Sequence, residues 1–437
     1  MGIWVERFPK LDFISRNLPW NHPDITKVWR WPIARYLNTF GWWAEDYTRP
    51  SVRFVFRAIK FVFLTVNLVY MISLTIGVRK QLQSTTNIMD NMFSFFAATP
   101  SFLGMGKIIC LLRQRRALRR IWKRLDDLLE NVLKRDVDEQ LEKELRWRLK
   151  RCWAMYSIFL TVGTCITLHW LLRPIVYALY GERTSIVSTW PTYLESWIQW
   201  FTTYIFQAMN ISSIGHALYI YDNVYFCICE NLLIHFAVIK HHLHQMDISK
   251  GKPGGVTMKF CISHHVKLMD ICMELRECSK YVIMQQVFWT IFILCPGVFE
   301  LVSGRQTDTT ILFNLMEITT IMTCILFFYS WYSNEVTLQS SQVFNTCYMS
   351  NWVEGTPNQR RTMMTMMTRS MKPMIFGGLV NVDLGTFISH RCSKVAYPEL
   401  CKNWADSEEM DHILSLSNVT NRAQGAGVVL LIVRLAI

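Results

Sequence analysis

Six stretches of the sequence are apolar over about 20 residues, the length that a helix needs to cross the hydrocarbon of a lipid bilayer. They cover residues 61–78, 92–112, 153–172, 197–221, 281–299 and 311–332. A seventh candidate, 374–389, is shorter and contains Asp383. The pattern predicts an all-α fold: a polytopic membrane helical bundle with six clear spans and an atypical seventh.

The composition agrees with a membrane bundle and argues against a set of soluble domains. Hydrophobic residues make up 51% of the chain and charged residues only 18%, and the charges gather between the apolar stretches. The net charge of +13 would suit a nucleic-acid binder if it lay on one surface. Because Lys and Arg fall in alternate loops instead, we expect no nucleic-acid partner and a multi-pass protein in contact with lipid.

The alternation of charge predicts the orientation. Residues 1–60, 113–151, 230–280 and 340–373 are basic, whereas 79–87, 181–196 and 303–310 are short and carry few charges. Basic loops stay on the cytoplasmic side, so the N-terminus and the segment 1–60 are expected to be cytoplasmic. Within the basic loops, apolar residues at three- and four-residue spacing predict an amphipathic helix over 118–133.

Three separated blocks carry a more specific signal. Residues 231–236 read NLLIHF, residues 261–265 read CISHH, and residues 331–335 read WYSNE, followed by Gln339. In this order and spacing the blocks resemble the insect odorant receptor family. The resemblance implies a cytoplasmic anchor that joins subunits. Its expected members are His235, Phe236, His264, His265, Trp331, Asn334, Glu335 and Gln339.

The resemblance also implies a function. Members of this family are subunits of ligand-gated cation channels, here a ligand-tuned subunit in a hetero-tetramer with the odorant-receptor co-receptor. It further implies plasma-membrane localisation in olfactory sensory neurons. The expected division is a transmembrane ligand-binding bundle (61–332), an anchor with the start of span seven (333–389) and a divergent tail (390–437). Two alternatives are a gustatory-type receptor channel of the same superfamily and a G-protein-coupled receptor, which the charge pattern disfavours.

A small neutral volatile is expected to bind in an apolar pocket in the outer half of the bundle. The expected lining residues are Phe93, Phe96, Leu160, Thr164, Tyr204, Gln207, Met209, Phe313 and Met316. For any one of them, ordinary helix packing is the more frequent role. As a group they predict that Tyr204→Ala or Thr164→Leu alters the rank order of odorants.

The titratable residues indicate structural roles rather than catalysis or metal binding. Glu317 is the one carboxylate in the sixth span, where it could bind a polar odorant group, pair with His169 or Arg173, or lie near the outer surface. Of these we expect a structural role. The histidines at 241, 242, 244, 264 and 265 lack a carboxylate at catalytic spacing, and the 13 cysteines are scattered. The sequence therefore predicts no metal site, no cofactor and no enzymatic activity.

The C-terminal end departs from the family pattern. After Ser389 the family continues with an apolar pore helix, whereas residues 390–411 contain eight charged side chains, among them Arg391 and Asp411. Charges at the bilayer centre cost about 2.5–3.5 kcal/mol each. Two explanations stay open: the transcript uses an unusual or retained-intron final segment that replaces the pore helix, or the chain has diverged and relies on pore helices of the co-receptor. The first is favoured, because the resemblance ends abruptly rather than decaying.

Overall fold

The computed structural model describes residues 50–84, 88–133, 138–186, 194–246, 258–303 and 309–371. Helices dominate these ranges, and no strand occurs within them, which confirms the predicted all-α class. The elements are α5 (Pro50–Ser84), α6 (Ile88–Leu133), α7 (Glu139–Leu179), α8 (Trp197–His244), α9 (Met258–Ser303), α10 (Thr309–Met349), the 3-10 turn η3 (Trp352–Glu354) and α11 (Pro357–Ser370). The predicted segment 374–389 and the tail 390–437 lie outside the described residues.

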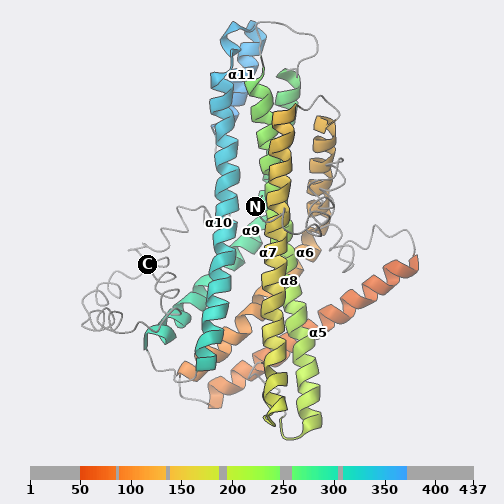
Figure 1. Ribbon diagram of the computed structural model, residues 1–437, viewed down its shortest axis with the longest axis vertical. Helices are drawn as coiled ribbons and strands as arrows, with labels where there is room; N and C mark the ends of the chain where they lie inside the picture. Colours follow the sequence, from red (N-terminus) through yellow and green to blue (C-terminus); the bar gives the residue numbers. More distant parts are fainter. Residues whose placement is uncertain are drawn as a thin grey trace, which may run out of the picture.

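Most helices extend well beyond the apolar stretches. In α6 the apolar part continues into the basic amphipathic stretch without a break, because no Gly or Pro occurs between Lys107 and Leu133. Helix starts are fixed locally: the Asp138 carboxylate accepts from Leu141 N at 2.9 Å before α7, and Ser196 forms a capping box with Gln199 before α8. The result is a bundle of long rods (Figure 1).

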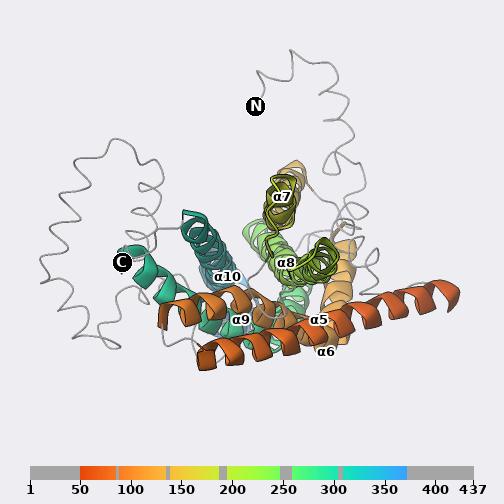
Figure 2. The same ribbon diagram turned by 90° about the horizontal axis from the view of Figure 1, so that it is seen from below.

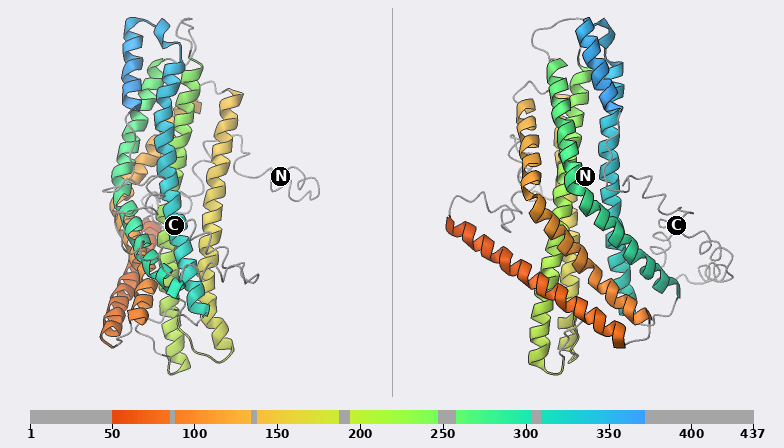
Figure 3. Two further views of the ribbon diagram at one scale, coloured as in Figure 1. Left: turned by 90° about the vertical axis from the view of Figure 1, so that its left-hand side faces the viewer. Right: turned by 180° about the vertical axis from the view of Figure 1, so that it is seen from behind.

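Helix α8 is the axis of the bundle, and it packs against α5, α6, α7, α9 and α10. Every residue from 220 to 239 is buried, so this half of α8 is covered on all sides. We call this end of the molecule, where α11 lies beside α10, the anchor end; it is at the top of Figure 1. Towards the opposite end, α9 and α10 diverge from α7 and α8, and α5 crosses the bundle obliquely (Figure 3).

Four helices meet the length and composition required to cross a membrane in the part of the chain that the structure describes. They are Phe61–Lys80 in α5, Glu139–Leu179, Trp197–His244 and Phe313–Met349 in α10. The predicted spans 92–112 and 281–299 fall in α6 and α9. The structure does not describe the side chains of residues 91–98 and 295–303 in these two helices. The count of six spans, the seventh span and the orientation therefore stay predictions.

Candidate functional site

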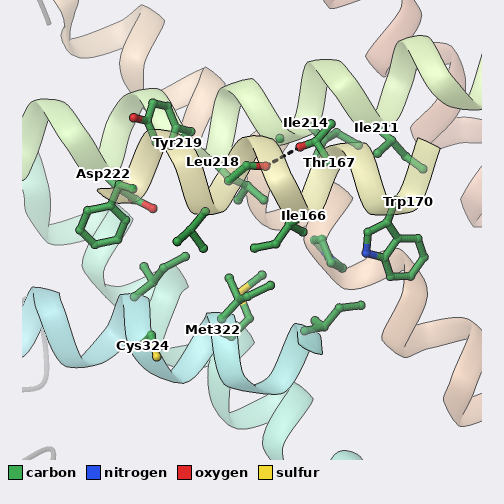
Figure 4. Close-up of a pocket in the computed structure, with 18 of the residues that line it drawn as sticks. Ile166, Thr167, Trp170, Ile211, Ile214, Leu218, Tyr219, Asp222, Met322 and Cys324 are labelled. Carbon is green, nitrogen blue, oxygen red and sulfur yellow. Dashed lines mark hydrogen bonds between the residues drawn. The ribbon is translucent and has the colours of Figure 1, made fainter. Parts of the chain in front are cut away.

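A cavity of about 310 Å3 lies between α7, α8 and α10, with α5 and α6 contributing at its edge. Figure 2 shows the separation of α7 from α10 on either side of α8. Most of the lining side chains are aliphatic or aromatic, and Figure 4 shows many of them pointing into a shared space. The lining residues are Tyr70, Pro100, Ser101, Phe159, Val162, Gly163, Ile166, Thr167, Trp170, Ile211, Ile214, Gly215, Leu218, Tyr219, Asp222, Asn223, Ile318, Thr320, Ile321, Met322, Cys324 and Ile325.

Two glycines on facing helices help to define this space. A Cβ at Gly215 of α8 would lie 2.9 Å from Thr167 Oγ1, so α7 and α8 touch closely there. A Cβ at Gly163 of α7 would come no nearer than 3.5 Å to the Tyr219 ring, an ordinary contact. Thr167 donates its hydroxyl to Gly163 O at 2.8 Å, within its own helix, which leaves the cavity wall largely apolar.

One end of the cavity is closed by Trp170, whose indole N–H is already used. Trp170 Nε1 donates to Glu317 Oε2 at 3.0 Å, and His169 Nδ1 lies 3.3 Å from the same oxygen without the alignment of a hydrogen bond. Arg173 instead donates to Ile186 O. Glu317 thus pairs with His169 and Trp170, in agreement with the structural role expected for it.

The opposite end contains Asp222, a residue that the sequence reasoning did not single out (Figure 4). Lys107 Nζ donates to both carboxylate oxygens, at 2.6 and 2.8 Å, and Tyr329 donates its hydroxyl to Oδ1 at 2.6 Å. The Lys107 side chain is fully buried and that of Asp222 is 4% exposed. The signal that could have found Asp222 is Lys107 itself, because a charge inside a predicted span requires a partner.

None of the nine residues expected to bind ligand lines this cavity. Thr164, Met209 and Phe313 are exposed, Leu160 and Met316 are half-buried, and the side chains of Phe93 and Phe96 lie outside the description. Tyr204 donates its hydroxyl to Leu171 O at 3.1 Å. Gln207 is buried and accepts from Ile186 N at 2.9 Å, which fixes the chain that follows α7.

Four of the residues expected in the anchor are buried in the interior of the helical bundle. His235, Phe236, His264 and His265 are at most 2% exposed. His235 Nε2 donates to Leu125 O at 3.2 Å, and His264 Nε2 lies 3.2 Å from His235 Nδ1, which ties α6, α8 and α9 together. Their burial places these histidines in the interior of the chain.

The block 331–339 packs onto α8 through successive side chains. Ser333 shares a hydrogen bond with Tyr225 at 3.1 Å, and Lys240 donates to Gln339. Gln339 in turn donates to Glu335 Oε1 at 3.0 Å. The Arg151 guanidinium lies over the Trp331 ring, 5.4 Å from its centroid. Asn334, another expected member, is half-buried.

The two histidines at the start of α9 are held neutral. Burial lowers the pKa of His265 to about 4, and the nearby Arg369 charge adds to this effect. Burial also lowers the pKa of His264 to about 2, with further contributions from His235, His242, Lys267 and His265. Among the described residues no group of three or more His, Cys, Asp or Glu side chains is placed to hold a metal ion.

These shifts predict that the protein loses stability in acid. The unfolded chain binds protons at these histidines below a pH of about 6.5, and the folded chain does not until about pH 4 for His265 and lower for His264. The free energy of unfolding should therefore fall by about 1.4 kcal/mol per pH unit for each histidine as pH drops from 6.5 to 4.

Thermal unfolding of the solubilised protein between pH 7.5 and 5 measures this effect. His265→Asn should reduce the slope, whereas His244→Asn, at an exposed position of α8, should leave it unchanged. Equal slopes for the two variants would contradict the prediction for His265.

Comparison with known proteins supports the helical fold described above and the family that the sequence resembles. A family model described as 7tm Odorant receptor matches residues 84–396. Odorant receptor 46a, isoform B, of Drosophila melanogaster is 24% identical over 403 residues, covering 83% of this chain and 94% of the relative. Odorant receptor 30a of the same organism is 20% identical over 184 residues, covering 41% and 48%.

Two solved structures share the fold. The insect olfactory receptor OR5 from Machilis hrabei superimposes with a TM-score of 0.67 at 14% identity, covering 79% of this chain and 88% of that one. The same receptor in complex with eugenol gives a TM-score of 0.68 at 15% identity, covering 82% and 94%. With a family model that spans most of the sequence, a bundle of long helices and a mostly apolar cavity inside it, this chain belongs to the 7tm odorant receptor family.

Proposed function

We propose that this chain is a ligand-tuned odorant receptor subunit that binds a small neutral volatile in the cavity between α7, α8 and α10. The observation that carries the proposal is the cavity itself: about 310 Å3, mostly apolar and with few polar groups. Ligand sites of this kind begin at about 300 Å3 and combine apolar walls with a few polar contacts. The complex of the Machilis receptor with eugenol, on the same fold, supports an odorant as the ligand.

The same proposal assigns the chain to a heteromeric ligand-gated cation channel with the odorant-receptor co-receptor. Its place would be the plasma membrane of olfactory sensory neurons. Family membership supports this assignment. The divergent tail makes the co-receptor the expected source of part or all of the pore.

Filling the cavity tests where the ligand binds. Gly163→Leu adds a side chain at a lining position of α7, where a Cβ still has ordinary contact distances, so the ligand loses space while the helix is retained. We expect the concentration for half-maximal response to odorants to rise at least about tenfold, since overlap with even part of a ligand costs more than 1.4 kcal/mol. The measurement is odorant-evoked current in cells that co-express the co-receptor.

The neighbouring substitution Thr164→Leu is the matched control, because Thr164 is exposed and lies outside the cavity. It should leave the response unchanged. The pocket expected from sequence alone predicts the opposite outcome, a changed rank order for Thr164→Leu. An effect of Thr164→Leu without one of Gly163→Leu would therefore overturn the cavity as the binding site, and a current that needs no co-receptor would contradict the heteromer.

A further inference from the structure

The Asp222 end of the cavity differs chemically from the rest of its wall. Among the described lining residues, Asp222 is the only Asp, Glu, Lys, Arg or His. It joins three helices, since Lys107 comes from α6 and Tyr329 from α10. Neither partner lines the cavity, so Asp222 is the member of this cluster that a bound molecule would meet.

The hydrogen bonds of Asp222 leave room for one more donor. A carboxylate offers about four lone-pair positions, two on each oxygen. Oδ1 accepts from Lys107 and from Tyr329, whereas Oδ2 accepts only from Lys107. Among the described residues, no other group donates to the remaining position on Oδ2. Asp222 lines a mostly apolar cavity, where a hydrogen bond to a charged group is stronger than it would be in water.

We propose that Asp222 selects ligands that carry one neutral hydrogen-bond donor, an alcohol or phenol hydroxyl, on an apolar body. The proposal rests on the proposed odorant site and specifies its ligand. Lys107 already balances the Asp222 charge, so a cationic amine would add an unbalanced charge to a buried cluster. An ether or ester presents only lone pairs to the carboxylate and leaves its open position unsatisfied.

The other end of the cavity sets the orientation of such a ligand. Trp170 donates its N–H to Glu317, so it offers the cavity an aromatic surface rather than a free donor. Figure 4 shows Trp170 and Asp222 at opposite ends, with Ile166, Leu218 and Met322 between them. The hydroxyl is thus directed to Asp222 and the apolar body lies along α7 and α10 towards Trp170.

Matched pairs of odorants that differ only in the donor test the proposal. The probes are eugenol with methyl eugenol, and 2-phenylethanol with its methyl ether. The full chain, co-purified with the co-receptor in lipid nanodiscs, is titrated with each probe, and the dissociation constant is read from the ligand-dependent shift of thermal unfolding. This readout does not require conduction. We expect the hydroxyl compound of each pair to bind at least about tenfold more tightly, as befits a hydrogen bond to a charged group.

The double variant Lys107→Met with Asp222→Leu removes the charges together and replaces them with apolar side chains of similar size, a change that buried ion pairs often tolerate. It should bring the ratio of the two dissociation constants within each pair close to one. The hydroxyl compound loses its hydrogen bond to Asp222, and the ether no longer leaves a carboxylate oxygen unsatisfied. Tyr329→Phe frees a second acceptor on Oδ1 and should keep or raise the preference for the hydroxyl compound.

Two results would overturn the proposal: equal affinities within both pairs in the unmodified protein, or a hydroxyl preference that persists in the double variant. In either case Gly163→Leu still reports on the proposed function separately. If it weakens all four probes alike, the cavity binds ligands and only the role of Asp222 is wrong.

Discussion

Replacing Lys107 alone with methionine is expected to lower the free energy of unfolding by about 3–5 kcal/mol, the cost of leaving a buried charge without its partner. Lys107 is fully enclosed and supplies two of the three hydrogen bonds to Asp222. Removing it leaves Asp222 with only the Tyr329 hydroxyl in the middle of the bundle. The measurement is the thermal unfolding midpoint of the solubilised protein, read together with the yield of monodisperse material.

Two comparisons make this result specific to the ion pair. Lys150→Met repeats the same chemical change at an exposed position of α7 and should alter the midpoint little. Adding Asp222→Leu to Lys107→Met should recover most of the lost stability, since neither charge remains to be solvated. A single Lys107 variant as stable as the Lys150 variant would show that the pair contributes nothing to the fold.

The helices could be predicted from the sequence in kind but not in length. Apolar runs indicate where a helix can lie in lipid, and apolar residues at three- and four-residue spacing over 118–133 indicate an amphipathic face, so both could be predicted. The apolar run and the amphipathic stretch form one helix, α6, because no Gly or Pro occurs between Lys107 and Leu133. This feature of the sequence predicts a continuous helix. The burial of residues 220–239 by protein on all sides could not be predicted from the sequence, because an apolar run is equally compatible with contact to lipid and with a protein core.

The cavity was beyond sequence reasoning for a different reason. Leu160 and Thr164 belong to α7, yet the positions of α7 that line the cavity are Phe159, Val162, Gly163, Ile166, Thr167 and Trp170. Which face of a helix meets a cavity depends on its rotation against neighbours, and apolar residues surround a lipid-exposed helix with little asymmetry. The divergence of α10 from α7, which opens the space, is a property of packing between segments about 150 residues apart.

The block 331–335 was recognised by resemblance, and the structure supplies its physical basis. Tyr332 and Ser333 reach α8 through hydrogen bonds, to Glu230 at 2.9 Å and to Tyr225 at 3.1 Å. Both tyrosines are enclosed by other aromatic rings, including that of Phe226, which stacks on Tyr332 with centroids 5.1 Å apart. Buried polar side chains need hydrogen-bond partners at defined positions. The spacing of such a block therefore identifies a fold more specifically than an apolar run does.

Glu230→Leu is expected to destabilise the anchor end by about 3–5 kcal/mol, because it removes the acceptor from two donors at once. Glu230 is 1% exposed and receives Arg151 through two hydrogen bonds, Nε to Oε1 at 2.8 Å and Nη2 to Oε2 at 2.9 Å. Tyr332 adds a third at 2.9 Å. Since a bidentate guanidinium–carboxylate pair is among the strongest polar contacts, its loss should appear as a lower unfolding midpoint and less surface expression.

A double-mutant cycle separates the contribution of the pair from that of general packing. Tyr332→Phe removes one hydrogen bond to a charged group and should cost about 1.5–3 kcal/mol on its own. In the Glu230→Leu background the same substitution should cost much less, because its acceptor is already gone. Additive effects would mean that Tyr332 acts through its ring rather than through Glu230. Coupling would instead show that Tyr332 of α10 and Glu230 of α8 stabilise the fold through their hydrogen bond.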